Sequence, residues 1–131
     1  MPYLVDADFV INALAKQKGA HTIISRLSPQ GLAISLVAVG EIYHKAYTST
    51  NPQAYLQISR EFIYPMKMLN LTEPIMEKFA EIRAYLFRVG KIIPDFDILI
   101  AATALHYDMT VLTFDYDHFS RVPDLRIYQV R

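Results

Sequence analysis

Short apolar runs alternate with longer amphipathic segments along this chain. The short runs are rich in apolar and β-branched residues, as in buried strands, and cover residues 3–6, 32–35, 66–71, 109–113 and 126–130. The segments between them carry apolar residues at helical spacing, over about 8–16, 20–27, 37–47, 52–64, 73–90 and 97–107. Strands that alternate with helices predict an α/β fold: a three-layer α/β/α domain whose central sheet has about five mostly parallel strands.

Helix boundary signals support this division. Asn51 followed by Pro52 is typical of an N-cap and a first helical position, and Pro65 ends the same segment. Thr72-Glu73-Pro74 opens the longest helix, and Gly90 is suited to terminate it. We therefore expect one domain over residues 1–131, in line with the usual domain size of roughly 100–150 residues.

Composition excludes several classes of protein. The chain has 131 residues, 53% of them hydrophobic, so it is long and apolar enough to form a core. The absence of cysteine excludes disulfide scaffolds, thiolate zinc sites and cysteine nucleophiles. The start of the chain lacks the pattern of a signal peptide, and no apolar stretch approaches the roughly 20 residues that span a bilayer, so we expect a cytoplasmic protein without a membrane partner. The net charge of zero excludes a strongly basic arm but leaves a local basic patch possible.

Acidic residues lie at or near the carboxyl ends of the predicted strands. Ligands of parallel sheets bind beyond these ends. Asp6 ends the first strand, and Glu41 lies on the helix after the second. Asp97 opens the helix before the fourth strand, and Asp115 follows that strand. If the sheet forms as predicted, these four carboxylates can converge on one pocket.

Each acid also has an ordinary structural interpretation. Asp8 and Asp95 fit helix N-caps better than ligands, and Asp97 would favour a helix dipole by about 0.3–1 kcal/mol. Asp117 is expected to be a solvated loop acid. Glu41 is harder to explain, because it lies in an apolar stretch where an unpaired carboxylate is costly.

Carboxylates that are brought together repel one another unless a positive charge joins them. Ligand sets made only of oxygen favour Mg²⁺ or Mn²⁺ over zinc. Such a site suits hydrolysis of a phosphodiester bond, because the ion activates water and stabilises the leaving oxygen. The pattern therefore predicts a metal-dependent hydrolase.

The sequence resembles the PIN domains, in particular the VapC-type toxin ribonucleases of toxin–antitoxin pairs. The most specific match is residues 97–104, where an Asp opens an Ile-Ala-Ala helix. Three further blocks are similar to the family pattern: residues 3–11, 35–42 and 110–115 with Phe119. The resemblance covers nearly the whole chain. It departs at Ala7, where the family often has a hydroxyl residue, and at Asp8, where it often has Asn.

The resemblance implies a metal-dependent endoribonuclease that uses Mg²⁺ or Mn²⁺, the toxin of a type II toxin–antitoxin pair. It implies that Asp6, Glu41, Asp97 and Asp115 form the catalytic and metal-binding set, with Thr113 supporting through a hydrogen bond. Asp8 and Asp95 are further supporting candidates. An RNA substrate, a cognate antitoxin protein and a homodimer are the implied partners.

Two other interpretations stay open at this stage. Asp6 and Asp8 also resemble the opening motif of haloacid-dehalogenase-like phosphatases, with Asp6 as nucleophile. A non-cleaving RNA- or protein-binding PIN module would keep the fold without the chemistry. The histidines form no metal-ligand pattern in the sequence, although His44 lies one helical turn after Glu41 and has the spacing to face the pocket.

Overall fold

The computed structural model describes residues 2–130, and its centre is a five-stranded sheet. All neighbouring strands pair in parallel. The strands, in the spatial order β3-β2-β1-β4-β5, are β1 (Tyr3–Val5), β2 (Leu32–Ser35), β3 (Lys67–Leu69), β4 (Thr110–Leu112) and β5 (Arg126–Ile127). The predicted parallel sheet is confirmed, although β3 and β5 are shorter than the apolar pattern indicated.

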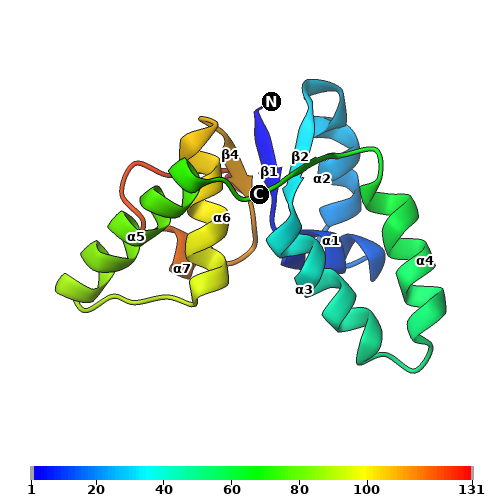
Figure 1. Cartoon of the computed structure of the whole chain (residues 1–131). Coiled ribbons are helices and arrows are strands. Elements are labelled where there is room, and N and C mark those ends of the chain that lie inside the picture. Colours follow the sequence, from blue (N-terminus) through cyan, green and yellow to red (C-terminus); the bar gives the residue numbers. More distant parts are fainter. Residues whose placement is uncertain (1, 131) are drawn as a thin grey trace.

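Helices cover both faces of this sheet. Figure 1 shows α1 to α4 on one side of the strands and α5, α6 and α7 on the other. The helices are α1 (Ala7–Leu14), α2 (Ala20–Leu27), α3 (Leu36–Tyr47), α4 (Pro52–Ile63), α5 (Glu73–Arg88), α6 (Asp95–His106) and α7 (Tyr116–Phe119), with a 3₁₀ turn η1 at Ser28–Gln30. The three-layer α/β/α fold is therefore confirmed.

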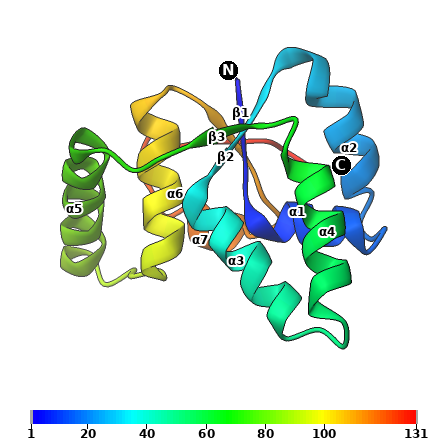
Figure 2. The same ribbon diagram turned by 45° about the vertical axis from the view of Figure 1, so that its right-hand side comes forward.

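The handedness of the connections explains this division. Steps from β1 to β2 to β3 move one way along the sheet, and steps from β3 to β4 to β5 move the other way. Right-handed crossovers then place their helices on opposite faces. In Figure 2 the segment containing β3 crosses from the end of α4 to the start of α5 on the far side. The direction reverses between β1 and β4, and ligands of open parallel sheets bind at the carboxyl ends of strands beside such a point.

Helix α6 packs between the sheet and α5 (Figure 1), and small side chains let it lie close to both. Ala101, Ala102 and Ala104 are fully buried, as is Leu86 of α5. Removing this apolar surface from water is the main favourable contribution to folding. Among the described residues, no helix combines the length and the apolar character needed to cross a membrane.

Two helix starts differ from the expected ones. The N-cap of α1 is Asp6, whose side chain accepts a hydrogen bond from the backbone N–H of Ala7, so the expectation that Asp8 caps this helix is wrong. Helix α6 begins at Asp95 after Pro94, so Asp95 is not an N-cap either. In both cases the polar residue that looked like the cap lies within the first turn of the helix. The helix predicted after Asn51 starts as expected, with the Asn51 side chain accepting from Ala54.

Truncation of the α5 core should be costly, while truncation of its exposed side should not. We expect Leu86→Ala to lower the free energy of unfolding by about 2–5 kcal/mol, because it leaves a cavity where α5 meets α6. Glu77→Ala on the same helix is the control, since Glu77 is exposed and surface changes stay within about 0.5 kcal/mol. Urea unfolding followed by circular dichroism measures both, and equal losses would contradict the assignment of the buried face.

Candidate functional site

Asp6 lies at the carboxyl end of β1, beside β4. Its backbone N–H donates to the Leu112 carbonyl at 2.9 Å, which continues the β1–β4 pairing. The carboxylate is held at both oxygens: Oδ1 accepts from the Ala7 N–H at 2.8 Å, and Oδ2 accepts from the Thr113 hydroxyl at 2.8 Å. The residue is only 5% exposed. Asp6 is thus fixed in orientation at the point where the sheet reverses direction.

Thr113 connects the end of β4 to the acids around it. Besides donating to Asp6, its Oγ1 accepts the backbone N–H of Asp115 at 2.9 Å. Asp8, in the first turn of α1, accepts the backbone N–H of Phe114 at 3.2 Å through Oδ2. The loop after β4 is therefore tied to α1 by side-chain bonds, and Asp8 serves this connection rather than a helix cap.

Glu41 projects from the middle of α3. Its Oε1 atom is buried and has no hydrogen-bond partner within residues 2–130. Glu41 also lines an open groove of about 650 Å³, together with Asp8, His44, Lys45 and Phe96. His44 therefore lies along the groove, as its spacing from Glu41 allowed.

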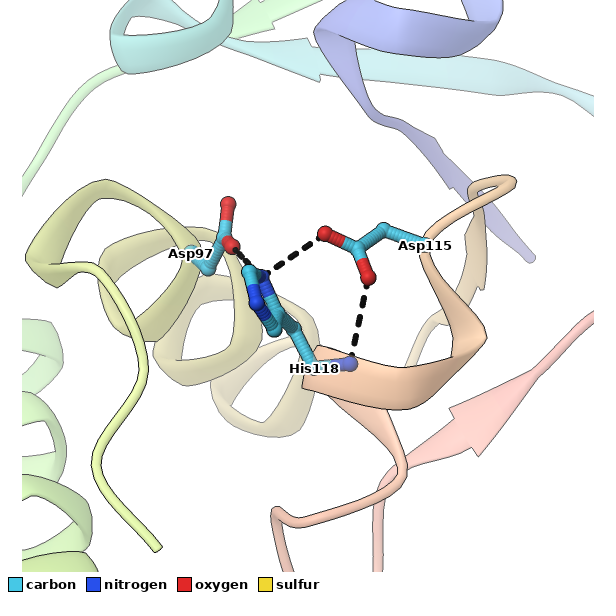
Figure 3. A group of neighbouring side chains, drawn as sticks. All are labelled: Asp97, Asp115 and His118. Carbon is cyan, nitrogen blue, oxygen red and sulfur yellow. Dashed lines mark hydrogen bonds and ion pairs between the residues drawn. The ribbon is translucent and has the colours of Figure 1, made fainter.

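Asp97 and Asp115 approach each other from α6 and from the N-cap of α7, on either side of His118 (Figure 3). His118 Nδ1 lies 2.9 Å from Oδ2 of Asp97 and 2.7 Å from Oδ2 of Asp115. Asp115 Oδ1 also accepts the backbone N–H of His118 at 3.2 Å. Together the three residues offer ligand atoms that all lie within 4.8 Å of one another.

His118 is the residue that sequence reasoning missed. No histidine pairs with another histidine along the chain, so no metal-ligand pattern was expected. The available signal was the spacing of three from Asp115, which puts both side chains on one turn. This spacing is informative only if residues 116–119 form a helix, and no separate signal in the sequence indicates that short element.

Burial and mutual repulsion raise the pKa of four carboxyl groups. Burial, with the charge of Asp8 next in weight, raises the pKa of Asp6 well above its usual range, although the Thr113 hydrogen bond opposes this. Burial, then the charges of Asp97 and Asp8, raises the pKa of Glu41 to about 7. The pKa values of Asp8 and Asp97 are raised as well, again mainly by burial. These are signs of carboxylates that lack a sufficient positive partner.

Two acids stay outside this group. Asp95 is exposed on the first turn of α6 and pairs with Arg83 of α5 at 2.9 Å. It therefore does not join Asp8 and Thr113, the other two residues predicted to support the site. Asp117 is exposed and pairs with Arg121, as expected of a solvated acid. The structure therefore gathers Asp6, Asp8 and Glu41 with the Asp97–Asp115 pair, and Thr113 lies among them.

A divalent cation fits this group of residues. Carboxylate oxygens, the donors that Mg²⁺ and Mn²⁺ prefer, dominate the set. The buried, unpartnered oxygen of Glu41 is a ligand atom without a counterpart in the protein. Asp6, Glu41, Asp97 and Asp115 are the residues that would hold the ion.

Comparison with known families agrees with the fold. Residues 3–125 match the PIN domain family. The chain belongs to that family. The phosphatase interpretation loses its support, because its short motif around Asp6 and Asp8 is accounted for within a PIN domain that covers nearly the whole chain.

Individual proteins are similar over the same length. Ribonuclease VapC2 of Haemophilus influenzae is 27% identical over 128 residues, which cover 96% of each chain. The tRNA(fMet)-specific endonuclease VapC of Salmonella typhimurium is 28% identical over 101 residues, covering 77% of this chain and 76% of the relative. The crystal structure of VapBC2 from Rickettsia felis, bound to a DNA fragment from their promoter, contains a chain that superposes with a TM-score of 0.90. That chain is 22% identical, with 98% of each chain covered, so it confirms the fold of this PIN domain.

The raised pKa values predict how stability depends on pH. Between about pH 4.5 and about pH 7 the folded protein retains a proton on Glu41 that the unfolded chain has released, so the free energy of unfolding falls as the pH rises. In EDTA at pH 8 we expect Glu41→Gln to be more stable than the wild type by about 1 kcal/mol, after allowing for solvent around a half-buried group. Below pH 4.5 the difference should vanish.

Urea unfolding at pH 8 and pH 4 measures this difference. Glu77→Gln, an exposed acid on α5, is the matched control and should differ little from the wild type at either pH. A Glu41→Gln variant whose stability tracks the wild type across this range would contradict the electrostatic account.

Proposed function

We propose that this PIN-domain protein is a metal-dependent endoribonuclease that hydrolyses RNA phosphodiester bonds, and that it is the toxin of a type II toxin–antitoxin pair. The observation that carries the proposal is the group of buried and half-buried carboxylates at the carboxyl edge of the sheet, with a raised pKa on each of Asp6, Glu41 and Asp97. The names of the Haemophilus and Salmonella relatives, a ribonuclease and an endonuclease, support RNA as the substrate.

The proposed cofactor is Mg²⁺ or Mn²⁺, held by Asp6, Glu41, Asp97 and Asp115. When bound, a divalent cation supplies the positive charge that offsets carboxylate repulsion, polarises the phosphodiester and makes water a better nucleophile. Thr113 and the Ala7 N–H keep the Asp6 oxygens in one orientation, so the site is formed before substrate arrives. No serine or cysteine nucleophile is needed.

Glu41 is suited to hold the ion through Oε1. Burial raises the pKa of Glu41 to about 7 in the metal-free protein, so a bound cation would take the place of a proton there. Its Oε1 has no competing hydrogen-bond donor within residues 2–130. The groove that Glu41 lines is open to solvent and also carries Lys45, which is positioned to attract a phosphate backbone.

An antitoxin is the proposed partner protein. The Rickettsia neighbour is part of a VapBC pair, which supports a comparable partner for this chain. A homodimer is proposed as well, and α5 offers exposed apolar side chains for it, among them Met76 and Phe87. A PIN module that binds RNA without cutting it is the remaining alternative, and a cleavage assay separates it from the nuclease.

Cleavage of a structured, end-labelled RNA in Mn²⁺ tests the proposal. We expect internal cuts that EDTA abolishes, and a loss of at least about 100-fold in kcat/KM for Asp97→Asn or Asp6→Asn. Each substitution removes a charge from the cluster at nearly unchanged volume. Cleavage that persists in EDTA, or in both variants, would rule the mechanism out.

The control for charge alone is Asp108→Asn. Asp108 lies just before β4, at the opposite edge of the sheet from the cluster, and pairs with Arg126 on the surface. Its backbone has a positive φ of 56°, a conformation that Asn tolerates as well as Asp. We expect this variant to keep the wild-type rate. An equal loss in Asp108→Asn and Asp97→Asn would show that the assay reports general charge or folding and not the site.

A further inference from the structure

The Asp97–Asp115 pair is joined by a single side chain. Asp97 belongs to α6 and Asp115 to the N-cap of α7, and both carboxylates carry negative charge when ionised. The ring of His118 lies between them, with Nδ1 at 2.9 Å from Asp97 and 2.7 Å from Asp115 (Figure 3). A carboxylate pair without a donor between its members would repel and turn apart.

One turn of helix builds half of this arrangement locally. Asp115 caps α7 by accepting the backbone N–H of His118, and the His118 ring reaches back to the other oxygen of the same carboxylate. The N-cap and the third helical residue therefore contact each other twice, once from backbone to side chain and once between side chains. The next residue, Phe119, is fully buried, so α7 is anchored and the His118 backbone is held in place. Asp97 is the long-range partner that the ring then reaches.

The contact leaves ligand atoms free. His118 meets Asp97 through Oδ2 only, so Oδ1 of Asp97 has no contact with the ring, and in Figure 3 it points away from it. Each carboxylate oxygen can also accept more than one interaction. The ring thus fixes the separation of the two carboxylates without using up their ability to bind an ion.

We propose that His118 is a positioning residue, which holds Asp97 and Asp115 at the separation at which one divalent cation can contact both. The inference rests on the proposed function, because it assumes that the two carboxylates are ligands. It assigns His118 no direct contact with the ion. Residues that orient ligands in this way typically change metal affinity by about 10–100-fold when they are replaced.

Binding of Mn²⁺, followed by electron paramagnetic resonance of the free ion, tests the role of His118 without an activity assay. The variants are His118→Ala and His118→Asn, each in the full chain. In Asn, as in His, a nitrogen bonded to Cγ can donate an N–H. The Asn side chain lacks the rest of the imidazole ring. His118 is 32% exposed, so neither variant opens a cavity in the core. His106→Ala, at the other end of α6, is the matched control.

We expect His118→Ala to weaken Mn²⁺ binding by at least about 10-fold and His118→Asn to restore it to within about threefold of the wild type. The control should bind as the wild type does. Unchanged affinity in His118→Ala would overturn the inference. Equal weakening in His118→Ala and His118→Asn would also overturn it, because the imidazole itself would then be the ligand.

The same titration separates this inference from the proposed function. A wild-type protein that fails to bind Mn²⁺ contradicts both. A wild type that binds Mn²⁺ and cleaves RNA, together with a His118→Ala variant of equal affinity, contradicts only the role of His118. Thermal melting of each metal-free variant serves as the folding check. If His118→Ala has unfolded, His118→Gln replaces it, because Gln also has no N–H donor on an atom bonded to Cγ.

Discussion

Repulsion among carboxylates gathered at one edge of the sheet is the constraint around which this structure is organised. Parallel strands deliver the acids that follow them to the same edge, and burial there removes the water that would screen their charges. The consequence is visible at Asp6, Asp8, Glu41 and Asp97, whose pKa values are all raised with burial as the leading cause. To keep these carboxylates close together, the protein needs hydrogen-bond donors that orient them and an external positive charge that offsets their repulsion.

The internal donors come from the elements that meet at this edge. The N-terminus of α1 supplies the Ala7 N–H to Asp6, and the loop after β4 supplies the Thr113 hydroxyl and the Phe114 N–H. Asp97 lies in the first turn of α6, where the helix dipole favours negative charge. The helices thus do two things at once: their buried faces form the core, and their N-terminal ends stabilise the acids. Glu41 receives no hydrogen bond at Oε1 from the described residues, so this oxygen depends on an external charge.

Much of this arrangement could be predicted from the sequence, because the patterns involved are local or periodic. The alternation of apolar runs and helical segments predicted the sheet, and the position of Asp6 at a strand end and of Glu41 in an apolar stretch pointed to the site. The exact helix starts could not be predicted, because Asp6 and Asp8 are both good N-caps and only the backbone decides between them. The surface pairing of Asp95 with Arg83 depends on how α5 packs on α6. The place of His118 depends on a four-residue helix whose stability comes from the burial of Phe119.

We infer that the cluster holds protons which a divalent cation displaces. Calorimetric titration of the wild type with Mn²⁺ at pH 7, repeated in buffers of different ionisation enthalpy, gives the number of protons released per ion bound. A pKa of about 7 at Glu41 predicts release of at least about half a proton at pH 7, with a larger number at pH 6. Saturable binding without proton release at pH 6 and pH 7, or no saturable binding at all, would contradict the account.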